Sequence, residues 1–165
     1  MKIVIALFLF CGIVTGQDMQ SCPMHKEHMK AESQADVEKR GDQAMGFPHE
    51  STTHHFRLLP DGGAIEVTVN DSKDSENVQA IRSHLRHIAT MFANGDFSIP
   101  MFVHNRVLPG VAEMKDKRAE TSYSFMELPG GGQVRIKTAD RDALNAVHDF
   151  LTFQIEDHHT GDKTE

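Results

Sequence analysis

The chain has 165 residues, which is enough for one domain with a hydrophobic core. Its 24 acidic and 17 basic side chains give a formal net charge of -7. This charge argues against general binding of nucleic acids or anionic membranes, which needs a basic surface. The 11 histidines and 9 methionines exceed the average share of these residues, so imidazole and thioether metal ligands are in surplus.

Residues 1–16 are typical of a secretory signal peptide. Lys2 precedes an apolar run over residues 3–14, which is too short to span a bilayer as a helix. We expect cleavage before Gln17 and a periplasmic or extracellular location, with no stable membrane span afterwards. Phe10 disfavours lipoprotein processing at Cys11, because that processing requires a small residue at the preceding position.

Residues 17–46 are polar and show no apolar periodicity, which predicts a flexible tail with a short helix around residues 31–40. The folded domain is expected over residues 47–162. After cleavage Cys22 is the one cysteine left in the sequence, so an intramolecular disulfide is impossible.

Residues 52–95 predict a β-hairpin followed by a helix. Apolar and polar residues alternate on both sides of a turn at residues 60–63, as in two paired strands. From Val78 to Phe92 apolar residues recur every three or four positions, which is the stripe of an amphipathic helix. This is copy one of a repeated unit.

Residues 121–159 repeat this pattern at an offset of 69 positions, with a three-residue deletion before the helix. Residues 96–120 connect the two copies, and their prolines argue against a central strand. We therefore predict an α+β fold: an internally duplicated ββα unit that forms a four-stranded antiparallel sheet with two helices on one face, preceded by the flexible tail.

One segment of the predicted tail concentrates soft metal ligands. A thiolate, thioethers and imidazoles lie within eight residues, a set that favours copper, above all Cu(I), with zinc as the second choice. The alternative is a disordered tail with incidental side chains. The candidate metal ligands of this segment are Cys22, Met24, His25, His28 and Met29.

Four histidines of the predicted domain are further candidate metal ligands. His54 is expected to face the helices together with Phe56, while a buried, hydrogen-bonded imidazole is the alternative for it. His49 lies on a nearby Gly/Pro loop. His84 and His87 lie on one side of the first helix, where copy two has phenylalanines; the alternative is a pair of histidines at the solvent boundary.

Several strings beyond Cys22 resemble a family of uncharacterised secreted bacterial proteins. They are RGDQAMGF at residues 40–47, TTHHF at 52–56 and FQIEDHHTGD at 153–162, and the CPMH string at 22–25 resembles bacterial heavy-metal-binding segments. Some members are labelled aspartate carbamoyltransferase. This chain does not support that activity, because it is too short for such a catalytic chain and lacks the Ser-Thr-Arg-Thr carbamoyl phosphate loop.

The leading hypothesis from the sequence is a secreted, histidine-rich metal-binding protein that sequesters or delivers copper, with a possible periplasmic protein partner. One alternative is a non-enzymatic binding or structural module with incidental histidines, and a third is a small metalloenzyme. The sequence contains no HExxH, P-loop, GxGxxG or Gly-x-Ser-x-Gly motif. The hypotheses differ in whether the domain histidines converge on one place in the fold.

Overall fold

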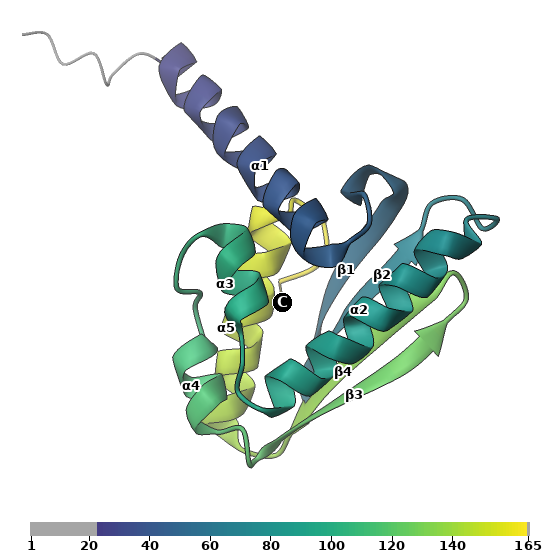
Figure 1. The fold of residues 1–165 in the computed structure, drawn as a ribbon. Coiled ribbons are helices and arrows are strands. Elements are labelled where there is room, and N and C mark those ends of the chain that lie inside the picture. The colour runs from purple at the N-terminus through teal and green to yellow at the C-terminus, as the bar shows by residue number, and fades with distance from the viewer. Residues whose placement is uncertain (1–22, 165) are drawn as a thin grey trace, which may run out of the picture. The chain divides into compact units, whose positions relative to one another are not determined.

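The secondary structure follows the predicted ββα repeat (Figure 1). The computed structural model describes the backbone of residues 23–164 and the side chains of residues 34–164. Residues 1–33 and 34–165 form separate compact units. In chain order the elements are α1 (Pro23–Met45), η2 (His49–Ser51), β1 (Thr52–Leu59), β2 (Gly62–Val69), α2 (Ser75–Ala93), α3 (Ser98–His104), α4 (Val111–Asp116), β3 (Thr121–Leu128), β4 (Gly131–Thr138) and α5 (Arg141–Asp157).

The strands form one antiparallel sheet in the order β1-β2-β4-β3. The helices α2 and α5 cover the same face of the sheet, as Figure 1 shows. This confirms the predicted α+β fold with four antiparallel strands and two helices on one face. None of the helices in the described part of the chain is long and apolar enough to cross a membrane.

The register of the central strands agrees with the predicted duplication. Ile65 of β2 pairs with Val134 of β4, which is its counterpart at the offset of 69 positions. On either side of this pair, Gly62 pairs with Lys137 and Thr68 with Gly131. These two pairs exchange under the same offset, so a pseudo-twofold axis passes between β2 and β4 at Ile65.

The two copies are intertwined through their helices. The helix α2 of copy one packs mainly on β3 and β4, and α5 of copy two packs most closely on β1 and β2. Aspartates start both helices: the Asp74 carboxylate accepts from Asn77 N–H, and that of Asp140 accepts from Ala143 N–H. Each copy therefore supplies the cover for the strands of the other.

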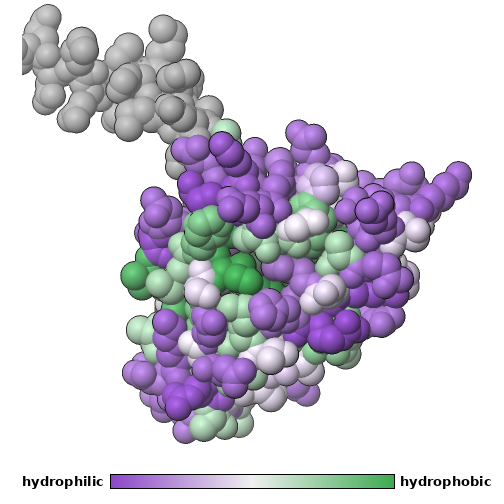
Figure 2. Space-filling view, viewed as in Figure 1, coloured by the Kyte–Doolittle hydropathy of each residue, from purple (hydrophilic) through white to green (hydrophobic). Residues whose placement is uncertain are grey.

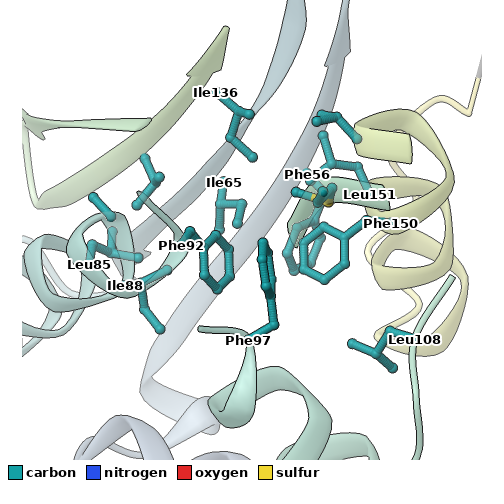
Figure 3. Packing of buried hydrophobic residues seen from close by; sticks show 14 of the residues in the cluster. Phe56, Ile65, Leu85, Ile88, Phe92, Phe97, Leu108, Ile136, Phe150 and Leu151 are labelled. Atoms are coloured by element: carbon teal, nitrogen blue, oxygen red, sulfur yellow. The ribbon is translucent and has the colours of Figure 1, made fainter. Parts of the chain in front are cut away.

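Aromatic residues fill the space between the two helices (Figure 3). The Phe97 ring lies between those of Phe92 on α2 and Phe150 on α5. Its centroid is 4.4 Å from that of Phe92 and 6.1 Å from that of Phe150. Offset and edge-to-face pairs of this kind add about 0.5–1.5 kcal/mol each beyond the burial of area. The connector thus contributes Phe97 to the core.

The helix α1 is longer than the sequence predicted. A short helix around residues 31–40 was expected, whereas α1 continues to Met45 and its second half packs on the domain. Val37 is buried, and Arg40 Nε donates to the Val103 carbonyl oxygen at 2.7 Å. Val37, Gly41 and Met45 are four residues apart and share one face. Residues 34–46, expected in the tail, therefore belong to the folded domain.

Candidate functional site

A cavity of about 350 Å³ lies against one end of the sheet, next to α1, α2, α3 and α5. Most of its lining is hydrophobic, because the inward faces of the strands and helices meet there. Figure 2 shows apolar side chains (green) gathered near the middle of one face and surrounded by hydrophilic ones. The larger apolar lining residues are Phe56, Ile65, Val67, Leu85, Ile88, Phe92, Ile99, Val103 and Phe150.

Histidines from five separate parts of the chain line this cavity. One lies in η2, one on β1, one on α2, one at the end of α3 and one directly after α5. In that order they are His49, His54, His84, His104 and His158. The fold therefore brings almost half of the 11 histidines of the sequence to a single place.

Three of these imidazoles are neutral. Burial, with a smaller contribution from neighbouring imidazoles, lowers the pKa of His54 and of His84 to about 4 and that of His158 to about 3. The His54 and His158 rings stack with centroids 6.3 Å apart. At pH 7 each of these neutral rings carries one donor and one acceptor nitrogen, and all three residues line the cavity.

The other two imidazoles are held by carboxylates. His49 Nδ1 lies 2.9 Å from Asp42 Oδ1, and its Nε2 lies 3.6 Å from Glu38 Oε2. His104 Nδ1 lies 2.8 Å from Asp157 Oδ2, and the His104 side chain is 2% exposed. A carboxylate partner fixes the tautomer and the orientation of an imidazole.

The end of the cavity beside α5 is polar. Gln154 is 4% exposed and its Oε1 lies 3.2 Å from His104 Nε2. The Gln154 Nε2 atom is buried and has no hydrogen-bond partner. A buried amide group without a partner costs about 1–3 kcal/mol, so this atom is a candidate contact for a ligand.

The structure brings three of the four candidate histidines of the domain to one place. His49, His54 and His84 line the cavity, while their role as metal ligands stays a prediction. His54 faces inward, and His55 faces away from it, where its Nδ1 meets the Asp162 carboxylate at 2.9 Å. The candidate His87 lies on the same side of α2 as His84, but it is exposed and is not among the residues that line the cavity.

His158 lines the cavity, although it was not among the candidate residues of the sequence analysis. The segment after α5 folds back along β1, where the Asp162 carboxylate accepts from Phe56 N–H at 2.9 Å. The His158 ring consequently stacks on Phe56 at 5.7 Å between centroids. No local pattern signals this return of the chain. His104 was not among the candidate residues either, because its burial depends on how α3 packs in the fold.

The candidate ligands of the tail lie outside the described side chains, and they stay predictions: Cys22, Met24, His25, His28 and Met29. Among residues 34–164, no three histidine, aspartate or glutamate side chains are placed to hold one metal ion. The histidines of the described domain therefore line one cavity as separate groups, without forming a set of ligands around one ion.

Comparison with protein-family models, curated proteins and solved structures gives no match to this chain.

Proposed function

We propose that the protein is a non-enzymatic binding protein that holds a small, uncharged, mainly apolar ligand in the histidine-lined cavity. The observation that carries this proposal is the cavity of about 350 Å³, whose mainly apolar walls carry the neutral imidazoles of His54, His84 and His158. Pockets for small ligands combine these properties: concavity, apolar lining and a few polar groups that fix orientation.

The charges around the cavity favour an uncharged ligand. The described lining contains no Lys or Arg that could neutralise an anion. The carboxylate in this lining is that of Glu38. The low pKa values of His54, His84 and His158 keep these groups uncharged at pH 7. An anion would lose its hydration without gaining a countercharge.

The test is the binding of N-phenylnaphthylamine, an uncharged dye that fluoresces in apolar surroundings. We expect saturable binding to the unaltered protein and loss of binding in Val103→Phe, which fills the cavity from α3. Val107→Phe is the matched control, because Val107 is 70% exposed and lies outside the cavity. Dye binding that persists in a folded Val103→Phe variant would refute the proposal.

A second candidate function is the sequestration or delivery of copper, with Cu(I) favoured and zinc as the alternative. The observation in its favour is the pairing of His49 with Asp42, which leaves His49 Nε2 beside the Glu38 carboxylate. Neutral imidazoles backed by carboxylates are common metal ligands. Met45 also lines the cavity and offers a thioether, a ligand that suits copper.

Metal retention under a competing chelator tests this candidate. The chain without residues 1–16 is offered Cu(I), Cu(II) and Zn(II), alongside His49→Ala and the exposed control His87→Ala. We expect chelator-resistant copper that His49→Ala weakens and His87→Ala does not. A double substitution of Cys22 and His25 measures the share of the tail. Retention of no ion by any form would exclude the copper function.

A further inference from the structure

The buried polar end of the cavity, formed by His104, Gln154 and Asp157, has an incomplete hydrogen-bond network. His104 in its neutral form carries one N–H, and the contact of its Nδ1 with the Asp157 carboxylate at 2.8 Å places the proton there. The His104 Nε2 atom is then an acceptor, and it faces the amide of Gln154.

Either orientation of the Gln154 amide leaves a polar atom unpaired. With Oε1 towards His104, two acceptors face each other and the buried Nε2 of Gln154 lacks an acceptor. With the amide rotated by half a turn, Nε2 donates to His104 Nε2, and Oε1 lacks a donor. The rotated amide leaves fewer atoms unpaired, and its missing partner is a hydrogen-bond donor, which a hydroxyl supplies.

The walls next to this polar end are aromatic. Phe150 lies one helical turn before Gln154 on the same face of α5, and Phe56 and Phe92 line the same cavity. Aromatic side chains favour aromatic ligands through edge-to-face and offset contacts. A dry cavity of about 150 Å³ is large enough for benzene, so about 350 Å³ accommodates a two-ring molecule.

We infer that the cavity takes a small phenolic molecule, with its rings between the phenylalanines and its hydroxyl hydrogen-bonded to the Gln154 amide. This inference rests on the proposed small-ligand function of the cavity. The ligand binds as the neutral phenol, since phenols ionise near pH 10 and the described lining offers no cationic side chain to a phenolate.

Binding of naphthol and naphthalene to the full chain, followed by calorimetry or ligand fluorescence, tests the inference. The two molecules differ by the hydroxyl alone. We expect naphthol to bind about tenfold more tightly, which corresponds to one hydrogen bond of about 1.4 kcal/mol. In Gln154→Leu this preference falls to about one while naphthalene affinity changes little. Gln34→Leu, an amide substitution elsewhere in the cavity lining, retains the preference.

The unaltered protein provides a second readout that does not depend on the folding of a variant. We expect the side-chain amide resonances of Gln154 to shift more with naphthol than with naphthalene, because naphthol adds a hydrogen bond to the ring-current effect that both molecules exert. Equal affinity for both molecules, or a preference that survives in Gln154→Leu, overturns the phenol inference and leaves the proposed function intact. If neither molecule binds and the dye also fails to bind, the proposed function itself is wrong.

Discussion

The residues that differ between the two copies explain where the cavity lies. His54 and Tyr123 occupy corresponding positions in β1 and β3, and only His54 lines the cavity. Tyr123 instead packs against Phe92 with ring centroids 5.9 Å apart, and its hydroxyl is buried without a partner. Burial raises the pKa of Tyr123 above its usual range. The two copies thus share a backbone arrangement but place different side chains at the corresponding positions of β1 and β3.

Removal of the Tyr123 hydroxyl should not destabilise the protein. Tyr123→Phe deletes a buried polar atom that lacks a partner, so we expect the free energy of unfolding to stay constant or to rise by about 1 kcal/mol. Urea denaturation measures this change. A decrease of more than about 1 kcal/mol would show that the hydroxyl has a partner in solution.

The neutral histidines predict a loss of stability in acid. His54, His84 and His158 have pKa values of about 4, 4 and 3 in the folded protein, below the ordinary value of 6.5. The unfolded chain therefore binds more protons between these values. Stability is complete above pH 6.5 and falls as the pH drops towards 4, by up to about 1.4 kcal/mol per pH unit for each imidazole.

A pair of histidine variants checks the origin of this slope. His54→Gln removes one of the three buried imidazoles, so the fall of unfolding free energy between pH 6 and pH 4 should become about a third shallower. His87→Gln changes an exposed histidine and should leave the slope as it is. Equal slopes for the unaltered protein and His54→Gln would mean that His54 is solvated.

At the scale of elements, Gly41 is among the residues by which the second half of α1 lines the cavity. A methyl group at Gly41 would meet Met45 Cε at 3.6 Å, an ordinary contact. At Gly110, where φ is 73°, it would collide with the Ala146 carbonyl oxygen of α5. The two glycines therefore serve different purposes, although the sequence does not distinguish them.

Alanine at these two positions should have opposite effects on thermal and urea unfolding. Gly41→Ala is expected to stabilise the protein by up to about 1 kcal/mol, because alanine favours the helix. Gly110→Ala is expected to destabilise it by about 1–3 kcal/mol, because the left-handed backbone is strained for alanine. A destabilising Gly41→Ala would indicate that α1 packs more tightly on the domain than its contacts show.

Features set by residues close together in the sequence were predicted correctly, and features set by contacts between distant residues were not. The hairpins and α2 were predictable, because alternation and helical periodicity are local properties of residues 52–95. The packing of α1 on the domain was not predicted, because Val37 and Met45 are too few apolar residues to form a recognisable stripe in a polar segment. His158 was missed for a related reason: its burial depends on Asp162 meeting Phe56, more than 100 residues away in sequence.

At the scale of the whole molecule, the exchange of helices makes the two copies interdependent. The helix α2 lies mainly on β3 and β4, so copy one alone would leave the apolar face of α2 without its partner strands. Duplication of a unit that stands on its own would instead give two separate small domains. The cavity between the helices is a product of this arrangement and exists in neither copy alone.

Fragments test this interdependence. Residues 34–116 and 117–165, produced separately, should each lack a cooperative unfolding transition in circular dichroism, whereas their mixture should recover one. The reason is that the core pairs Phe92 of copy one with Phe150 of copy two. A first fragment that folds as a monomer would contradict this expectation.

The contact between Asp162 and β1 also bears on aggregation. β1 is an outer strand of the sheet, and the N–H groups of such a strand are a template for strands of other molecules. The Asp162 carboxylate accepts a hydrogen bond from the N–H of Phe56 and brings a negative charge to that edge. Loss of this one carboxylate would open the edge to intermolecular pairing, so the C-terminal segment protects solubility as well as enclosing the cavity.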